Sequence, residues 1–430
     1  MKIKIIFDIS VLGHGNGCKI SKTGVFRVTE NLLLQLAKNE HIQLFLCSSR
    51  KNYIECTNYL RMSDCFKESD IIYSNKFFES SKLYLKHKID SLTKKIHHKN
   101  FFLFNLFFKV IRKICYKIFH FIEEKDKNNV IPQKILKKAN IYQSCFHSIP
   151  KQIRNNKNIK KFLMIHDLIP ILFPHYFNET ERNLILHTIN EIEDENIICV
   201  SDSTKKDLIN YKKDLNLEKI MVSLLGVSEN LSKIEDLQEI EKIKTKYHIP
   251  KGSKYVLSLS TIEPRKNIQQ SIKAFVKLIE ENNIADLYLV LCGIKGWHYD
   301  NIFSLIENYS THKDKIIFSG FVDEEDLVYI YSGALVFIFP SFYEGFGLPC
   351  LEAMKCGVPV IASNRSSIPE VVGDGGILID PDNETEITKS ILEIYKNPTL
   401  REELSKKSLQ QSKKFSWDKF GNEVVDFYLK

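Results

Sequence analysis

The chain has 430 residues, of which 43% are hydrophobic and 27% are charged. That composition is typical of globular proteins and excludes disordered and fibrous ones, and the length favours two or three domains. The formal net charge of +8 is compatible with nucleic acid, anionic lipid or phosphorylated substrates and does not choose among them.

Short apolar runs alternate with helical patterns in the N-terminal half, as they do in parallel α/β proteins. Residues 2–9 predict a first strand rather than a signal sequence, because their apolar run is too short and contains the acid Asp8. Residues 25–37 predict an amphipathic helix. Further strands are predicted at Ile42–Cys47, Ile141–Gln143, Phe162–Ile165 and Ile197–Val200.

Two features bear on the cellular compartment. No run of about 18 apolar residues occurs, so we expect no helix that spans a membrane. The ten cysteines contain no C-x-x-C pair and no zinc spacing. We therefore expect reduced thiols in a cytoplasmic protein rather than the disulfides of a secreted scaffold.

The positive charge is concentrated in one segment, Lys82–His120. It holds ten Lys or Arg and one acid, a net charge of +9 that leaves −1 for the remainder. Five Phe lie within residues 101–108, and an apolar stripe flanked by cations follows at helical spacing, as in helices that lie in a membrane interface. We expect this segment to contact an anionic membrane. An ordinary amphipathic helix that covers the first domain is the alternative, and the clustered Phe favour lipid over nucleic acid.

A second α/β series follows the charged segment 227–251, which is a candidate domain junction. Helices are predicted at Ile268–Glu281, Glu324–Ser332 and Leu348–Cys356. Two such series predict two doubly wound domains that face a cleft, with ligands at the carboxyl ends of the strands. The strands of this series are predicted at Tyr255–Ser260, Leu287–Cys292, Ile316–Ser319, Leu335–Phe339, Val358–Ala362 and Gly376–Ile379.

The strongest motif follows the predicted strand Leu335–Phe339 and contains two Glu separated by seven residues, Glu344 and Glu352. Glu344 lies in a loop and Glu352 about a turn into the next helix, so one can reach a sugar and the other a ribose diol. For two isolated Glu, a solvated loop acid and a surface helix residue would be the ordinary interpretation. The glycines, prolines and apolar residues around them argue against it.

The glycines of this motif, Gly345 and Gly347, allow a ligand to approach the backbone closely. The helix predicted from Leu348 directs its N-terminal amides and its dipole toward an anion such as phosphate. These features predict a site for a phosphorylated ligand.

A second motif, Thr261–Asn267, lies between a predicted strand and a helix and contains Arg265 and Lys266. Two cations at a helix start oppose the helix dipole, so a bound anion would explain them, and a diphosphate is the obvious candidate. Two solvated surface side chains are the alternative.

Together with Ser319–Val322 and Pro359–Val371, these two motifs resemble those of a family 4 retaining glycosyltransferase of GT-B architecture. The resemblance is strongest over Tyr255–Asp382. It implies two Rossmann-like domains, a nucleotide-sugar donor and transfer with retained anomeric configuration.

The resemblance also implies the domain bounds. The acceptor-side domain would be residues 1–227, with the basic aromatic insert at about 75–130, and the donor-binding domain would be residues 228–415. The closing residues 416–430 would form a helix that returns to the first domain.

The resemblance assigns the donor contacts by position. Glu344 would contact hydroxyls of the donor sugar, and Glu352 the ribose. Lys266, with Arg265, would bind the diphosphate. Many relatives carry an Arg where this chain has Ser260, so either Arg265 supplies the second cation or diphosphate binding is weaker.

Backbone groups would complete the donor site. The resemblance places the nucleobase at Val322, and sugar and phosphate at the amides of Phe346, Gly347 and Leu348. It keeps one glycine of the family's Gly-Gly loop, Gly24, near the phosphate.

His166 and Asp167 follow a predicted strand of the first domain. A lone His is more often structural, but a His-Asp pair at the carboxyl end of a strand favours function. The resemblance places His166 beside the donor sugar and the attacking hydroxyl, with Asp167 nearby. In retaining enzymes of this kind, the departing phosphate oxygen is a candidate for the group that takes the acceptor proton.

No metal and no cofactor are expected, because the resemblance implies a metal-independent reaction. Asp380-Pro-Asp382 matches the D-x-D motif, which is the metal-binding signature of the other glycosyltransferase architecture. It follows a late predicted strand, so we interpret it as a turn.

Within the family, the Glu-Pro-Arg-Lys-Asn and His-Asp-Leu-x-Pro segments are most similar to bacterial mannosyltransferases that use GDP-mannose to build surface polysaccharide such as lipopolysaccharide O-antigen. We therefore predict a hexosyltransferase that moves mannose from GDP-mannose to a lipid-linked polysaccharide, in the cytoplasm at the inner face of the plasma membrane. Alternatives are a UDP-glucose, UDP-GlcNAc or UDP-galactose donor, a GT-B epimerase or phosphorylase, and a catalytically silent membrane scaffold. The glutamates and cations of the two motifs argue against the scaffold.

Overall fold

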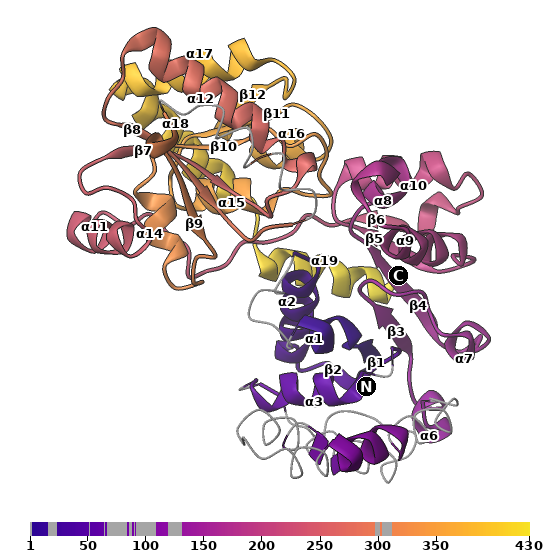
Figure 1. Cartoon of the computed structure of the whole chain (residues 1–430). Coiled ribbons are helices and arrows are strands. Elements are labelled where there is room, and N and C mark those ends of the chain that lie inside the picture. Colours follow the sequence, from indigo (N-terminus) through magenta and orange to yellow (C-terminus); the bar gives the residue numbers. More distant parts are fainter. Residues whose placement is uncertain are drawn as a thin grey trace. The chain divides into compact units, whose positions relative to one another are not determined.

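The computed structural model describes residues 2–15, 24–50, 52–63, 65–66, 84–85, 88–89, 91, 109–118, 131–296, 302 and 312–430. Their contacts form two compact units, Met1–Leu163 and Met164–Lys430 (Figure 1). The domain bounds near residues 227 and 415 stay predictions.

The first sheet is parallel and has six strands in the order β2-β1-β3-β4-β5-β6. The division between the two units passes through β4. Five of the strands match predicted ones to within two residues at either end. Its strands are β1 (Ile3–Asp8), β2 (Ile42–Cys47), β3 (Ile141–Ser144), β4 (Lys160–Ile165), β5 (Asn196–Cys199) and β6 (Ile220–Val222).

The second sheet lies wholly within Met164–Lys430, and its six strands are ordered β12-β11-β10-β7-β8-β9. All of its described pairings are parallel. The two sheets confirm the predicted α/β class with doubly wound parallel sheets. The strands of the second sheet are β7 (Lys254–Leu259), β8 (Leu287–Cys292), β9 (Ile316–Gly320), β10 (Val336–Phe339), β11 (Val360–Ser363) and β12 (Gly376–Ile379).

Helices connect the strands, as parallel pairing requires. In the first unit they are α1 (Ser10–Gly15), α2 (Gly24–Lys38), α3 (Tyr53–Arg61), α6 (Gln133–Leu136) and α7 (Lys151–Arg154). In the second unit they are α8 (Ile169–Leu172), α9 (Glu179–Asn190), α10 (Asp202–Tyr211), α11 (Leu237–Lys246), α12 (Ile268–Asn282), α14 (Leu327–Ser332), α15 (Leu348–Lys355), α16 (Ile368–Val372), α17 (Glu384–Lys396), α18 (Pro398–Ser412) and α19 (Trp417–Leu429).

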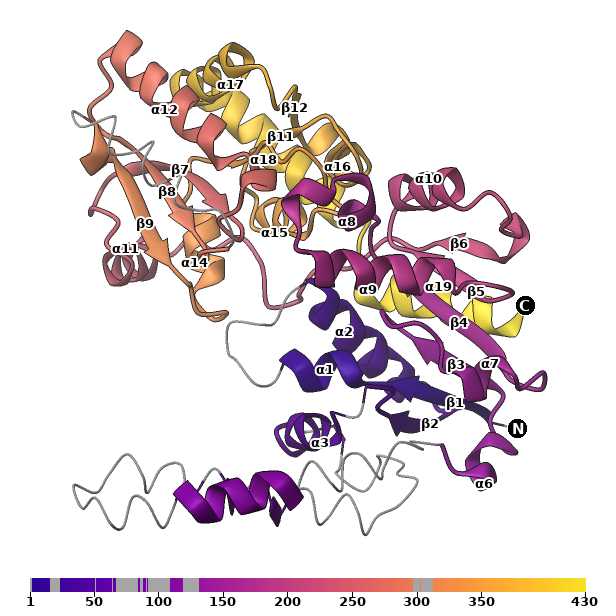
Figure 2. The ribbon, with the colours of Figure 1, turned by 45° about the vertical axis from the view of Figure 1, so that its right-hand side comes forward.

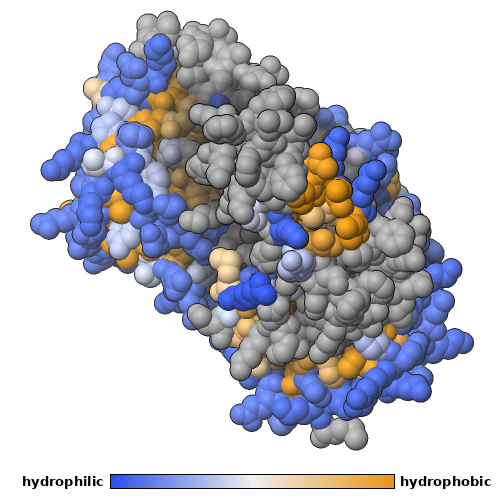
Figure 3. Space-filling view, turned by 60° about the horizontal axis from the view of Figure 1, so that its bottom comes forward, coloured by the Kyte–Doolittle hydropathy of each residue, from blue (hydrophilic) through white to orange (hydrophobic). Residues whose placement is uncertain are grey.

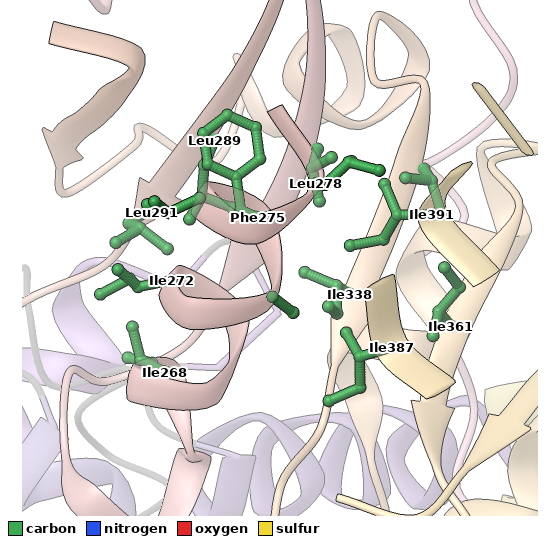
Figure 4. Packing of buried hydrophobic residues seen from close by; sticks show 14 of the residues in the cluster. Ile268, Ile272, Phe275, Leu278, Leu289, Leu291, Ile338, Ile361, Ile387 and Ile391 are labelled. Carbon is green, nitrogen blue, oxygen red and sulfur yellow. The ribbon is translucent and has the colours of Figure 1, made fainter. Parts of the chain in front are cut away.

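One face of α12 packs on the second sheet. Ile268, Ile272 and Phe275 recur at helical spacing and belong to one buried cluster with Ile387 and Ile391 of α17 (Figure 4). All five side chains are at most 2% exposed, and each such burial contributes about 1.5–3 kcal/mol. This core makes the second sheet a rigid support for the loops at its strand ends.

Several described elements were not predicted from the sequence, among them the long helices α9, α17 and α18. The candidate junction 227–251 contains α11, whose Ile240 and Lys244 are buried. β6 was not predicted, because it has only three residues. α10 was not predicted either, because its sequence is polar and it buries only Thr204 and Leu208.

The predicted membrane segment falls largely outside the described residues. Of Lys82–His120, the structure describes residues 84–85, 88–89, 91 and 109–118, so the five Phe of residues 101–108 lie outside them. Among the helices that are described, none is long and apolar enough to cross a bilayer. The nine cysteines of the described residues are free thiols.

Candidate active site

Two loops of the second unit meet at the carboxyl ends of β7 and β10, which are neighbours in the sheet. The first contains a 3₁₀ turn, Pro264–Lys266, and leads into α12. The second, residues 340–347, leads into α15. The Arg265 carbonyl accepts hydrogen bonds from the Phe342 amide at 3.0 Å and the Ser341 hydroxyl at 3.2 Å. Loops of neighbouring parallel strands form the ordinary ligand site of such a sheet.

Glu344 is held between two cations where the loops meet. Its Oε1 lies 2.6 Å from Nζ of Lys266, and its Oε2 lies 3.0 Å from Nη1 of Arg265. The Ser341 hydroxyl donates to the same Oε1 at 2.6 Å. Arg265 also pairs with a second carboxylate, since its Nη2 lies 2.6 Å from Oε1 of Glu263. Glu344 is only 8% exposed, so it is neither solvated nor an ordinary loop acid.

The charges of this cluster shift one another's pKa values. Burial opposes ionisation of Glu344, but Arg265 and Lys266 outweigh it and lower the pKa of this carboxyl to about 2. Burial and the adjacent Arg265 lower the pKa of Lys266, although Glu344 opposes them. Glu344 and Glu263 raise the pKa of Arg265 against burial. Glu344 is therefore a carboxylate at neutral pH, held by two cations.

The loop backbone around Glu344 is fixed by serine hydroxyls. The Glu344 amide donates to Ser366 Oγ at 2.9 Å, and Ser367 Oγ lies 2.9 Å from the carbonyl oxygens of both Glu344 and Phe346, between which its one proton is shared. Gly347 has φ 111° and directly precedes α15, a left-handed conformation that favours glycine. The predicted helix start at Leu348 is confirmed.

The side chains of Phe346 and Leu348 point inward. They are 5% and 8% exposed, and the Phe346 ring contacts Phe415, with the ring centres 6.1 Å apart. Because these side chains are buried, only their backbone groups could meet a ligand, and their expected role in donor binding stays a prediction.

His166 and Asp167 are brought to the same loop. A Cβ on Gly345 would lie 2.2 Å from the His166 carbonyl oxygen and 3.0 Å from the Asp167 Cβ. Thr204 Oγ1 lies within hydrogen-bond distance of the carbonyl oxygens of His166 and Gly345, at 3.1 and 3.3 Å, and shares its one proton between them. The structure therefore joins the His-Asp pair and the Glu344 loop, which are about 180 residues apart in the chain.

Asp167 is half-buried beside the charged cluster. Burial raises its pKa, while the amide of Ile169, which donates to it at 2.9 Å, lowers it, as does the charge of Arg265. This carboxyl is therefore a candidate proton carrier at the edge of the site.

The other predicted site residues lie elsewhere in the fold. Glu352 is in α15, 2% exposed, and its Oε2 accepts a hydrogen bond from the Tyr331 hydroxyl at 2.9 Å, so it is no surface residue. Val322 follows β9 and is 5% exposed. Gly24 begins α2 in the other unit, and its neighbour Thr23 lies outside the described residues.

Asp380 and Asp382 bind a side chain of the protein. Both accept from Arg365 Nη2, at 2.7 and 2.6 Å. They lie directly after β12, at a turn, as predicted. Among the described residues no group of three or more His, Cys, Asp or Glu is arranged to hold a metal ion.

Several residues of the site were not predicted. Ser341 and Glu263 lie within the two motifs. Each is a polar residue within three positions of Glu344 or Arg265, and that proximity in sequence was the available signal. Asp207 accepts a hydrogen bond from the Tyr343 hydroxyl. It lies on a helix 136 residues before Tyr343, and no local sequence pattern predicts the contact.

Comparison with known proteins places these loops in a recognised family. Residues 239–411 match the family model described as "Glycosyl transferases group 1". Over 271 residues the chain is 35% identical to the O-antigen chain mannosyltransferase B of Escherichia coli, an alignment that covers 61% of this chain and 68% of that one.

A second relative is longer. The chain is 30% identical over 275 residues to the serotype-specific mannosyltransferase WbdA of Escherichia coli, which covers 63% of this chain and 33% of WbdA. The chain thus spans about a third of that relative's length.

Among solved structures, sucrose-phosphate synthase of Thermosynechococcus elongatus has a TM-score of 0.65 over 100% of this chain and 98% of that one, at 18% identity. At that identity the likeness shows the fold alone. Together with the family match, it confirms the expected GT-B fold class.

Proposed function

The chain belongs to the glycosyl transferases group 1 family, and we propose that it is a retaining mannosyltransferase that moves mannose from GDP-mannose to a growing lipid-linked polysaccharide. One observation carries the proposal: a buried carboxylate, Glu344, lies between Lys266 and Arg265 at the ends of two adjacent strands. Such a cluster offers cations for a diphosphate and a carboxylate for sugar hydroxyls. The choice of mannose rests on the motif resemblance and on the relatives' names.

The proposed reaction uses the cluster in a fixed order of contacts. The donor diphosphate binds Lys266 and Arg265 and competes with Glu344 for them, which frees the carboxylate to bind hydroxyls of the sugar. As the bond from C1 of mannose to the phosphate oxygen breaks, the two cations stabilise the charge that develops on the diphosphate. The acceptor oxygen bonds to C1 on the same face, and the departing phosphate oxygen takes its proton.

The donor assignment is tested by thermal unfolding with a panel of sugar nucleotides. We expect GDP-mannose at a hundredfold excess over its Kd to stabilise the protein by about 2.7 kcal/mol, which raises Tm by a few degrees. GDP-glucose is the matched control for the sugar, and UDP-glucose, UDP-GlcNAc and UDP-galactose are the controls for the base. Stabilisation by a UDP-sugar but not by GDP-mannose would refute the choice of donor.

The reaction class is tested by the products. We expect mass spectrometry to show one hexose added to a mannose-terminated acceptor. NMR should show an α-linkage, because GDP-mannose is an α-glycoside and the configuration is retained. Release of nucleotide without an acceptor product would indicate the epimerase, and dependence on inorganic phosphate the phosphorylase.

We further propose that the protein acts in the cytoplasm, at the inner face of the plasma membrane. Part of the predicted membrane segment is described as a helix over residues 109–118 (Figure 2). One side of it is packed, since Cys115 and Ile111 lie against Ile89.

The adjoining side of this helix is exposed and apolar. Val110, Ile114 and Ile118 recur every four residues and are 49%, 51% and 44% exposed. On the face in Figure 3, exposed hydrophobic residues likewise lie among hydrophilic ones. An exposed apolar stripe beside a row of cations suits the surface of an anionic bilayer. The row is Lys109, Lys113 and Lys117, all exposed.

Removing the cations should weaken membrane binding. At about 1 kcal/mol for each lysine near an anionic surface, we expect the triple alanine variant to bind vesicles of phosphatidylglycerol and phosphatidylethanolamine about a hundredfold more weakly in co-sedimentation. The substitutions are Lys109→Ala, Lys113→Ala and Lys117→Ala.

A matched control removes three exposed lysines of the second unit. We expect it to bind the same vesicles as the unsubstituted protein does, and transfer to a water-soluble acceptor should survive in both variants. Equal binding by the two triple variants would contradict the membrane proposal while leaving the donor assignment intact. The control substitutions are Lys406→Ala, Lys407→Ala and Lys413→Ala.

A further inference from the structure

Helix α10 presents one side to the loop that carries Glu344. Ser201 caps this helix and is followed by Thr204 and Asp207, and side chains three residues apart lie on one face. The Ser201 hydroxyl donates to the Gly345 carbonyl at 2.7 Å, and the Thr204 hydroxyl lies 3.3 Å from the same oxygen. The Tyr343 hydroxyl lies 2.8 and 2.9 Å from the two carboxylate oxygens of Asp207.

These contacts hold the residues on both sides of Glu344. Tyr343 is tied through its side chain and Gly345 through its carbonyl. The Tyr343 carbonyl also accepts a hydrogen bond from Arg265 Nη1 at 2.6 Å. A shift of Tyr343 would therefore move both the carboxylate and one of its two cations.

The bond between Tyr343 and Asp207 is formed in a partly buried setting. Burial and the adjacent carboxylate raise the pKa of Tyr343 to about 12, so the phenol stays protonated and donates across the physiological pH range. The ring of Phe173 packs on that of Tyr343, with the ring centres 4.9 Å apart. The phenol therefore has restricted freedom to turn away from Asp207.

The N-terminus of α10 is itself anchored. Glu370 of α16 accepts hydrogen bonds from the amides of Asp202 and Ser203 at 2.7 and 2.8 Å, which satisfies amides that a helix start leaves free. The two helices are neighbours in the ribbon (Figure 2). Ser366 and Ser367, which directly precede α16, hold the Glu344 backbone. The loop is thus fixed from α10 and from α16, which are also bonded to each other.

We propose that Asp207 and Tyr343 are positioning residues for the transfer reaction. Asp207 acts through Tyr343: it orients Arg265 and Glu344 toward the donor and touches no reacting atom itself. The inference rests on the proposed function, and it adds a helix that neither motif contains to the apparatus of the donor site. Because a displacement of about 1 Å in such a group costs up to about a hundredfold in rate, loss of this contact should be visible in kcat.

A double-mutant cycle tests the inference. We expect Tyr343→Phe and Asp207→Ala each to lower kcat/KM for GDP-mannose about tenfold, with the KM for the acceptor unchanged. The double variant should be no slower than either single one, because both remove the same contact. Asp207→Asn retains a carbonyl oxygen that accepts from the phenol, so it should recover most of the activity.

Two readouts separate positioning from a merely structural role: the additivity of the losses in the double variant, and the Tm of each variant. Asp214→Ala, at a side chain 77% exposed just beyond α10, is the control and should match the unsubstituted protein. Additive losses in the double variant would overturn the proposal, as would a lowered Tm with unchanged kcat/KM for the folded fraction.

The outcome is distinguishable from failure of the proposed function. If the unsubstituted protein transfers no mannose, GDP-mannose is the wrong donor, and the cycle is run with whichever sugar nucleotide raises Tm in the panel. If the unsubstituted protein transfers mannose and Tyr343→Phe does so equally well, the donor assignment stands and the positioning role is refuted.

Discussion

Replacing Lys266 by methionine should lower kcat by about 100- to 1000-fold, the usual cost of removing one group that stabilises charge in a transition state. Methionine keeps the buried stem of the side chain, which is 13% exposed, and removes only the ammonium. The diphosphate then leaves with Arg265 as its single neighbouring cation. The measurement is kcat and KM with GDP-mannose, together with Tm.

The matched control is Lys277→Met. Lys277 lies in α12, directly after the same loop, and pairs with Glu384 at 3.6 Å, so it has a comparable charge and partner away from Glu344. We expect it to retain full activity. If Lys266→Met kept its kcat within threefold of the unsubstituted protein, Lys266 would not stabilise the leaving group.

Gly345→Ala should abolish transfer for a steric reason. The added Cβ would lie 2.2 Å from the His166 carbonyl oxygen, a backbone atom that cannot move aside as a side chain can. Either the Glu344 loop or the His166-Asp167 segment must shift, and overpacking of this kind costs about 1–3 kcal/mol. The measurement is kcat/KM with GDP-mannose, alongside the free energy of unfolding in urea.

The control for this substitution is Gly252→Ala, where a Cβ meets nothing within 4 Å. Its φ of 70° makes alanine cost about 1–2 kcal/mol through backbone strain alone, a loss comparable to that expected for Gly345→Ala. Transfer should survive in this control. Full activity of Gly345→Ala would show that the close approach to His166 is not needed for catalysis.

Much of the fold was predictable because the chain repeats one local pattern. Buried parallel strands are near-continuous apolar runs, and Ile42–Cys47, Leu287–Cys292 and Gly376–Ile379 were predicted with the bounds that the structure has. β6 and α10 were not predicted, because three residues in one case and a polar sequence in the other carry too weak a periodicity.

The two loops of the site were also predictable, because each follows a buried strand and precedes a helix. That context placed Lys266 and Glu344 at the carboxyl ends of strands, which is where a parallel sheet binds its ligands. The order of the strands was beyond local pattern, so the pairing of β7 with β10 that joins the two loops came only from the fold.

The sequence by itself determined the class of the protein: alternating strands and helices, two loops rich in charge and glycine, and one concentrated basic segment. Only the tertiary structure decided that Glu344 would be buried between Arg265 and Lys266, and that Tyr343 would meet Asp207 across 136 residues. The physical reason is range. Periodicity and helix signals arise between residues a few positions apart, whereas burial and the charge environment of a carboxylate depend on residues that the chain brings together only when it folds.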